Sequence, residues 1–293
     1  MLTTQVLING LLVGGIYAMV ALGLNLIFGV LRIINFAHGE FLMVGMYAVL
    51  VLSWLGIDSY TSILIVVPLL FVLGALCEKF LIRYTLSAPA HVKIFVTLGL
   101  AIVLQNLALL LFSADYQTIS ASPAQTGVWL VQGISLSKPR VVAFIAMLLV
   151  SGALFWFFKS SDFGRAIRAT AQDRVVARLM GVNVNRVQLV AFALGSAIVG
   201  LTACLMAPIY TVFPTMGNEF ALAAFVVVIL GGLGSLPGAI IGGLLIGVVE
   251  QATAFFLDSG LRQVVYFIFF MIVLAVRPAG LLGQRGAEEI GLK

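Results

Sequence analysis

Long apolar runs recur along the chain and are separated by shorter polar stretches. An α-helix needs about 20 apolar residues to cross the hydrocarbon core of a bilayer. The pattern predicts nine such spans, at residues 5–28, 36–55, 61–82, 93–113, 140–158, 187–210, 219–233, 237–257 and 262–277. The run at 219–233 and part of 36–55 are short or interrupted by glycine and could be half-helices, so eight full crossings is the alternative. We therefore expect an all-α, polytopic membrane helix bundle of about 8–9 transmembrane helices.

The composition excludes a soluble enzyme. Hydrophobic residues fill 62% of the 293 positions and charged residues only 9%, against roughly 25% charged residues in soluble domains. So few charges cannot cover a water-facing surface of this size, and the surface is therefore expected to face lipid. No linker or low-complexity stretch divides the chain. We expect a single transmembrane domain over residues 1–293.

Basic residues gather in one polar stretch, residues 159–186, which holds six of the 16 lysines and arginines. They are Lys159, Arg165, Arg168, Arg174, Arg178 and Arg186. Because cytoplasmic loops carry an excess of Lys and Arg, this loop is predicted to be cytoplasmic. Alternating crossings then place the N-terminus outside and, with nine spans, the C-terminus inside. Lys138 and Arg140 run against the rule, since they fall on the outer side.

Within this loop, the residues that follow Asp162 have the pattern of an amphipathic helix. Ile167, Ala171, Val175 and Leu179 recur every four residues, and Gly181 suits the left-handed residue that ends a helix. We expect one helix of about 24 Å. It could dock in the groove of a cytoplasmic partner, or it could rest on anionic lipid headgroups.

A glycine-rich break follows at residues 231–243. Six glycines and a proline weaken any helix there, so the segment cannot be a lipid-facing helix. Gly234, Gly238 and Gly242 stand four residues apart, which predicts close packing of helices. No Lys-Ser or Lys-Thr pair follows, so the break does not indicate a nucleotide-binding loop.

Polar residues inside the spans are the candidates for a translocation pathway or gate, because they are costly in lipid. They are Asn25, Asn35, His38, Glu40, Gln105, Asn106 and Glu250. We interpret residues 35–40 as an interfacial turn that caps the second span. Deeper burial would require a pairing such as His38 with Glu40, or Arg32 with Glu40. Glu250 is the most costly group if it is central, and it is expected to face the bundle or a water-lined path.

The residues of intramembrane catalysis are missing. The chain has two histidines, no HExxH motif and no Gly-x-Ser-x-Gly motif. No span holds a close pair of carboxylates. We therefore predict no catalytic residues, no metal site and no cofactor bound by this chain.

Four segments together resemble the permease subunits of branched-chain amino-acid ABC importers, of the LivH type. They are residues 10–30, 34–41, 164–181 and 231–243, in the order of the family, and the resemblance covers essentially the whole chain. The resemblance implies a multi-pass protein of the bacterial inner membrane. It also implies a second, homologous permease subunit, two cytoplasmic ATPase subunits that bind ATP and Mg²⁺, and a periplasmic solute-binding protein.

The resemblance implies that residues 165–181 form the coupling helix that sits in a cleft of an ATPase subunit. The implied contact residues are Arg165, Arg168, Asp173, Arg174, Ala177, Arg178 and Gly181. Asp173, Ala177 and Gly181 stand at positions of the loop signature of ABC permeases. That signature usually begins Glu-Ala-Ala, whereas this chain has Ala171-Gln172-Asp173.

The function that follows from the resemblance is transport of branched-chain or related small amino acids from the periplasmic binding protein to the cytoplasm. Two alternatives stay open at this point. Related permeases carry urea or short amides, and an autonomous secondary carrier could use Glu250 to couple an ion.

Overall fold

Helices make up most of the computed structural model, which describes residues 2–119, 127–131 and 134–283. The α-helices are α1 (Leu2–Leu31), α2 (His38–Trp54), α3 (Ile63–Cys77), α4 (Arg83–Thr85), α5 (Ala90–Phe112), α6 (Lys138–Ser160), α7 (Asp162–Gln172), α8 (Arg174–Leu179), α9 (Val184–Met206), α10 (Met216–Gly231), α11 (Leu236–Phe256) and α12 (Arg262–Val276). A π-helical turn, η1 (Glu78–Ile82), joins α3 to α4, and a 3₁₀ turn, η2 (Ser259–Leu261), precedes α12. Strands β1 (Val128–Val131) and β2 (Ile134–Ser137) pair antiparallel as a hairpin.

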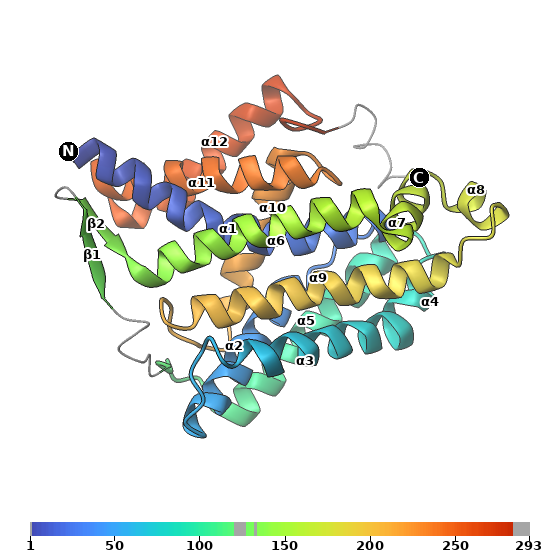
Figure 1. Cartoon of the computed structure of the whole chain (residues 1–293), viewed down its shortest axis with the longest axis horizontal. Helices are drawn as coiled ribbons and strands as arrows, with labels where there is room; N and C mark the ends of the chain where they lie inside the picture. The colour runs from blue at the N-terminus through green and yellow to red at the C-terminus, as the bar shows by residue number, and fades with distance from the viewer. Residues whose placement is uncertain (1, 120–126, 132–133, 284–293) are drawn as a thin grey trace.

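The bundle has two ends (Figure 1). The N-terminus and the β1–β2 hairpin lie at one, the hairpin end, and α7 and α8 lie at the other, the α7–α8 end. Helix α1 has 30 residues, a length of about 45 Å, and runs between the ends beside α6 and α9. This arrangement confirms the all-α membrane bundle. The hairpin falls in a stretch for which the apolar pattern predicted no element.

Seven helices among the described residues are long and apolar enough to cross a membrane, and two shorter apolar helices, α2 and α10, accompany them. They correspond to the nine apolar runs of the sequence. The two short helices fall on the runs that were expected to be short.

Helix α2 is short because it begins inside the bundle. The Nε2 atom of His38, its first residue, lies 3.0 Å from the carbonyl oxygen of Val20, three turns before the end of α1. Residues 32–37 therefore lead back along α1 before the chain turns into α2. His38 and Glu40 are 0% and 1% exposed, so the turn at residues 35–40 packs inside the protein. Its interfacial position stays a prediction. Within the described chain, no ion pair joins Glu40 to His38 or Arg32.

Close packing at glycines holds the bundle centre together. A Cβ atom on Gly23 of α1 would lie 2.7 Å from the carbonyl oxygen of Gly195 of α9, and a Cβ on Gly195 would lie 2.7 Å from that of Gly23. Gly247 of α11 meets the backbone of Gly14 of α1 in the same manner. Small residues let backbones approach where lipid supplies no hydrophobic drive. Helix α1 is consequently the most buried of the long apolar helices that the structure describes.

The contacts of the first helices repeat in the second half of the chain. Helix α1 packs against α10 and α11, and α9 packs against α2 and α3. The long helix α1 of the first half thus contacts the short helix α10 and the long helix α11 of the second half. In the same way, α9 of the second half contacts the short helix α2 and the long helix α3 of the first half. The short helices α2 and α10 also meet, where Gly39 packs on the backbone of Gly217.

Candidate functional site

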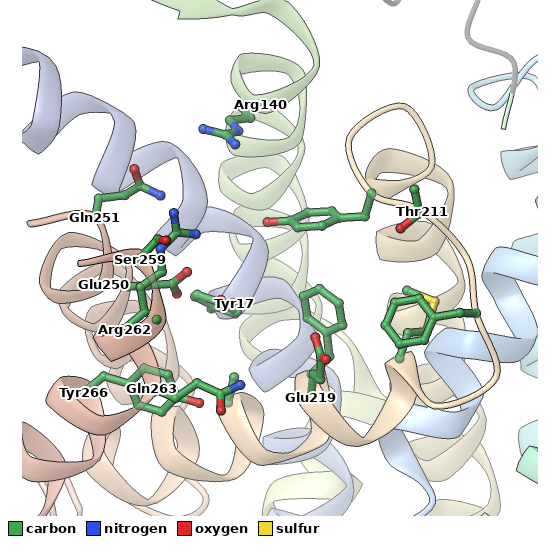
Figure 2. A pocket seen from close by; sticks show the side chains of 16 residues that line it. Tyr17, Arg140, Thr211, Glu219, Glu250, Gln251, Ser259, Arg262, Gln263 and Tyr266 are labelled. Carbon is green, nitrogen blue, oxygen red and sulfur yellow. The ribbon is translucent and has the colours of Figure 1, made fainter. Parts of the chain in front are cut away.

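A pocket of 340 Å³ lies among α1, α6, α10, α11 and α12, within the range of small-molecule sites (Figure 2). Arg140, near the start of α6, and Arg262, which begins α12, place it toward the hairpin end. The lining comprises Tyr17, Arg140, Tyr210, Thr211, Phe213, Met216, Glu219, Phe220, Ala223, Glu250, Gln251, Ser259, Gly260, Arg262, Gln263 and Tyr266.

Two cations and two anions line this pocket. Arg140 and Arg262 face a space shared with Glu219 and Glu250 (Figure 2). In the part of the chain that the structure describes, no ion pair joins any of the four. Glu250 is 8% exposed. Its Oε2 atom and the Nε atom of Arg262 are buried with no hydrogen-bond partner among the described residues.

Aromatic side chains form the apolar part of the wall. The ring of Phe220 lies 6.4 Å from that of Tyr17 and 5.4 Å from that of Tyr210, measured between ring centroids. Tyr17 also lies next to Glu250 (Figure 2). Phe213 and Met216 complete this side. The pocket therefore combines charged groups of both signs with an apolar wall.

Local structure explains how the charged groups reach the pocket. The Asp258 carboxylate accepts a hydrogen bond of 2.6 Å from the backbone N–H of Gly260 and caps the 3₁₀ turn that leads into α12 at Arg262. Helix α10 begins at the pocket with Met216, and Glu219 stands in its first turn. A helix N-terminus carries a partial positive charge, which favours an acidic residue there.

The polar candidates from the sequence divide between several places, of which the pocket holds only Glu250. Asn25 accepts a hydrogen bond of 2.6 Å from the N–H of Gly234, and Asn35 accepts one of 3.1 Å from that of Ala37. Both therefore support turns of the backbone. Gln105 and Asn106 lie in α5, which packs mainly on α2, η1 and α4 rather than on the pocket helices.

The side chain of Glu40, from the first turn of α2, packs against the first turn of α10. A Cβ atom on Gly217 would lie 2.5 Å from Oε2 of Glu40, and that oxygen has no hydrogen-bond partner among the described residues. Met216, the neighbour of Gly217, lines the pocket. At the N-terminus of α10, Met216 therefore contacts the pocket and the next residue, Gly217, contacts the Glu40 carboxylate.

The glycine-rich break covers the end of α10, the connection at residues 232–235 and the first two turns of α11. Gly238 packs on the backbone of Gly231, and Gly242 packs on the carbonyl of Val227, with the Cβ position 2.7 Å from its oxygen. Gly234 has a φ of +82°, and a Cβ atom there would make only an ordinary contact, 3.8 Å from the Cα of Gly29. Its backbone conformation is the one that favours glycine.

The segment after Asp162 is two helices, and the expectation of one continuous helix is wrong. Asp173 has an extended backbone, with φ −149° and ψ +115°, and separates α7 from α8. Its carboxylate accepts hydrogen bonds of 2.7 Å and 3.0 Å from the N–H groups of Val175 and Val176. An aspartate at this position favours a new helix start over continuation. These backbone amides, that of Val176 first, lower the pKa of Asp173. Gly181, with φ +84°, follows the end of α8 as expected.

Helices α7 and α8 expose different surfaces. In α7, Arg165 forms an ion pair with Asp162, and the Arg168 guanidinium donates to the carbonyl of Phe158. In α8, Ala177 is buried and Arg178 is exposed. Four apolar side chains of the α8 region are also 54–81% exposed, namely Val175, Val176, Leu179 and Met180. They lie beyond the long helices at the α7–α8 end (Figure 1).

Two arginines tie the end of α1 to the α7–α8 junction. Arg32 donates hydrogen bonds of 2.9 Å and 3.2 Å to the carbonyls of Ala171 and Gln172. Arg174 donates one of 3.1 Å to the carbonyl of Val30. We call these reciprocal bonds the arginine clasp. Sequence reasoning assigned Arg32 no role beside α7, since the two partners lie about 140 residues apart.

Comparison with known proteins gives the family. Residues 6–276 match the family described as "Branched-chain amino acid transport system / permease component". The chain belongs to this family. The permease is 33% identical to the high-affinity branched-chain amino acid transport system permease protein BraD of Pseudomonas aeruginosa, over 98% of this chain and 97% of the relative. It is 31% identical to LivH of Escherichia coli, with the same coverage. No solved structure matches it.

A second kind of permease subunit is also related to this chain. The LivM permease protein of Escherichia coli is 25% identical over 91% of this chain and 68% of the relative. LivM and LivH are both named as permease proteins of the high-affinity branched-chain amino acid transport system. The family membership confirms a multi-pass membrane permease.

Four residues of its pocket were absent from the pathway candidates of the sequence, namely Tyr17, Arg140, Glu219 and Arg262.

Proposed function

We propose that this permease is a subunit of an ATP-driven importer and carries branched-chain amino acids across the bacterial inner membrane. The observation that carries the proposal is its match, almost from end to end, with relatives named for branched-chain amino acid transport. The proposed assembly contains a second, LivM-like permease, two cytoplasmic ATPase subunits and a periplasmic solute-binding protein. ATP and Mg²⁺ bind to the ATPase subunits, and this chain is not an enzyme.

The proposed orientation puts the α7–α8 end in the cytoplasm and the hairpin end in the periplasm. Arg165, Arg174 and Arg178 at the α7–α8 end support it, because basic loops remain on the cytoplasmic side. The N-terminus then lies in the periplasm and the C-terminus in the cytoplasm. The pocket lies toward the hairpin end, where the binding protein would deliver its solute.

The α8 surface is the proposed contact with an ATPase subunit. Val175, Val176, Leu179 and Met180 expose apolar area beyond the spans, where water rather than lipid would otherwise meet them. A short helix that inserts its apolar residues into a groove is a common mode of recognition. Charged Arg178 on the same helix adds a group for an acidic rim of that groove.

The arginine clasp gives a route by which ATPase closure would reach the pocket. Movement of α7 and α8 would be passed to the end of α1 through Arg32 and Arg174. Helix α1 would carry the displacement to Tyr17 at the pocket, since a packed helix moves as a rigid body. Fixed charges at the pocket would replace the water lost by a zwitterionic solute.

A substitution of Leu179 tests the α8 surface. We expect Leu179→Asp to abolish co-purification of the ATPase subunits and ATP-driven leucine uptake into proteoliposomes, because a carboxylate would be buried in an apolar groove. Val128→Asp is the matched control, since Val128 is an exposed apolar residue at the other end. It should retain the ATPase subunits. Retention of both ATPase binding and uptake by Leu179→Asp would contradict the docking role.

A reconstitution experiment separates the importer from an autonomous carrier. The complete assembly should accumulate leucine only with ATP, whereas the permease subunit alone should accumulate none. Leucine accumulation by the chain alone, driven by an ion gradient, would overturn the proposed function.

A further inference from the structure

The four charged groups of the pocket balance in number, and no ion pair joins them among the described residues. Glu250 is the buried member, Arg140 and Arg262 are half-buried, and Glu219 is exposed. A buried charge such as Glu250 normally binds a partner, since an isolated charge in a low-dielectric site is costly. Glu250 and Arg262 lie near one another on α11 and α12 (Figure 2). Within the described residues no ion pair joins them, and Glu250 Oε2 and Arg262 Nε have no hydrogen-bond partner. These two atoms are therefore the ones available to a ligand.

The ligand that satisfies both groups carries one negative and one positive charge. An arginine guanidinium matches a carboxylate, with two parallel hydrogen bonds in the favourable case. A buried carboxylate is an equally suitable acceptor for an ammonium group. An anion alone would leave Glu250 unsatisfied, and a cation alone would leave Arg262 unsatisfied.

The remaining wall selects the rest of the ligand. Tyr17, Phe213, Met216 and Phe220 offer apolar contact beside the charged groups. A volume of 340 Å³ lies at the lower end of the range for small-molecule sites. The pocket therefore fits one small amino acid with an apolar side chain better than a peptide or a sugar.

We propose that this pocket is an amino-acid site within the permease itself, in which Arg262 binds the carboxylate, Glu250 binds the ammonium group, and the aromatic wall holds the apolar side chain. Arg140 and Glu219 set the field around the two binding groups. The choice of leucine as the probe rests on the proposed function. It assigns to this subunit a recognition step of its own, separate from the binding protein.

The experiment measures leucine binding to the full-length chain in lipid nanodiscs with its permease and ATPase partners, and without the soluble binding protein. Isothermal titration compares leucine with leucinamide, which lacks the carboxylate, and with 4-methyl-2-oxopentanoate, which lacks the ammonium group. Each analogue should bind about tenfold or more weakly than leucine, because one charged group of the pocket stays unsatisfied. Equal binding of all three compounds to the unsubstituted protein would overturn the proposal.

Substitutions then assign the two groups. Arg262→Gln should weaken leucine binding about tenfold and leave leucinamide binding almost unchanged. Glu250→Gln should also weaken leucine binding about tenfold, but it should leave binding of the oxo acid almost unchanged. The matched controls are Arg186→Gln and Asp115→Asn, two exposed residues outside the pocket. They should bind leucine normally. Size-exclusion profiles check that each variant is folded.

The outcomes distinguish this inference from the proposed function. Undetectable leucine binding, or binding that both pocket variants retain, overturns the amino-acid site even if the assembly imports leucine with ATP. Specific binding without ATP-driven import supports the site and contradicts the proposed function.

Discussion

Glycines decide how closely the two short helices approach. A side chain on Gly217 would occupy the space of the Glu40 carboxylate, and Gly39 packs on the backbone of Gly217 from the other helix. Both glycines have ordinary helical backbones, so the requirement is for space and not for a special φ. The single-residue feature that permits the α2–α10 contact is therefore the absence of a Cβ atom.

Gly217→Val tests this requirement for space. We expect the substitution to destabilise the permease by about 1–3 kcal/mol, because extra atoms in a packed core force side chains and backbone apart. Thermal unfolding in detergent measures the change. Gly99→Val is the matched control, since no described heavy atom lies within 4 Å of a Cβ on Gly99. Equal unfolding temperatures for the two variants would contradict the packing argument.

At the scale of elements, one carboxylate divides a predicted helix into two. Asp173 caps α8 with its side chain and ends α7 with its extended backbone. The periodicity of apolar residues continues through the break, so spacing alone indicated one helix. Competition between a side-chain acceptor and the helical carbonyls decided the outcome.

The pH dependence of α8 follows from the lowered pKa of Asp173. Because the folded pKa lies below the unfolded one, the stabilisation is complete above the unfolded pKa of about 3.9 and is lost as pH falls through the folded pKa. The amides of Val175 and Val176 should therefore lose protection from hydrogen exchange only in strong acid. Protection is measured as the exchange rate relative to the intrinsic rate at the same pH. Asp173→Asn should keep α8 and remove this pH dependence, whereas Asp173→Ala should fray α8 at neutral pH. The same acid response in Asp173→Asn would exclude the cap as its cause.

At the scale of the whole molecule, α1 connects the two ends of the bundle. It lines the pocket at Tyr17 and bonds to the α7–α8 junction through the arginine clasp. It also packs on α9, α10 and α11, so a displacement of α1 involves both halves of the chain.

Loss of the clasp should uncouple ATP hydrolysis from transport. We expect Arg32→Gln combined with Arg174→Gln to lower leucine uptake per ATP hydrolysed, because hydrogen bonds to charged groups contribute about 1.5–3 kcal/mol each and three are weakened. ATPase activity and uptake are measured on the same proteoliposomes. Arg186→Gln serves as the control and should keep the ratio. A normal ratio in the double variant would exclude the clasp from coupling.

The sequence by itself determined that this protein faces lipid, where its nine apolar runs lie and which two of them are short. Those properties follow from apolar length and glycine content, since lipid imposes the same requirement on every span. It also marked Gly181 as a helix end, which the structure confirms. The cost of Glu250 in the membrane stays a prediction. The functional roles of the remaining pathway candidates stay predictions.

Only the tertiary structure decided which polar groups meet. Tyr17, Arg140, Glu219 and Arg262 come from four helices far apart in the chain, and Arg32 meets a junction 139 residues away. The burial of His38 depends likewise on a return of the chain along α1. Apolar periodicity reports how each helix meets lipid, whereas a pocket depends on how helices pack on one another, which no local pattern contains.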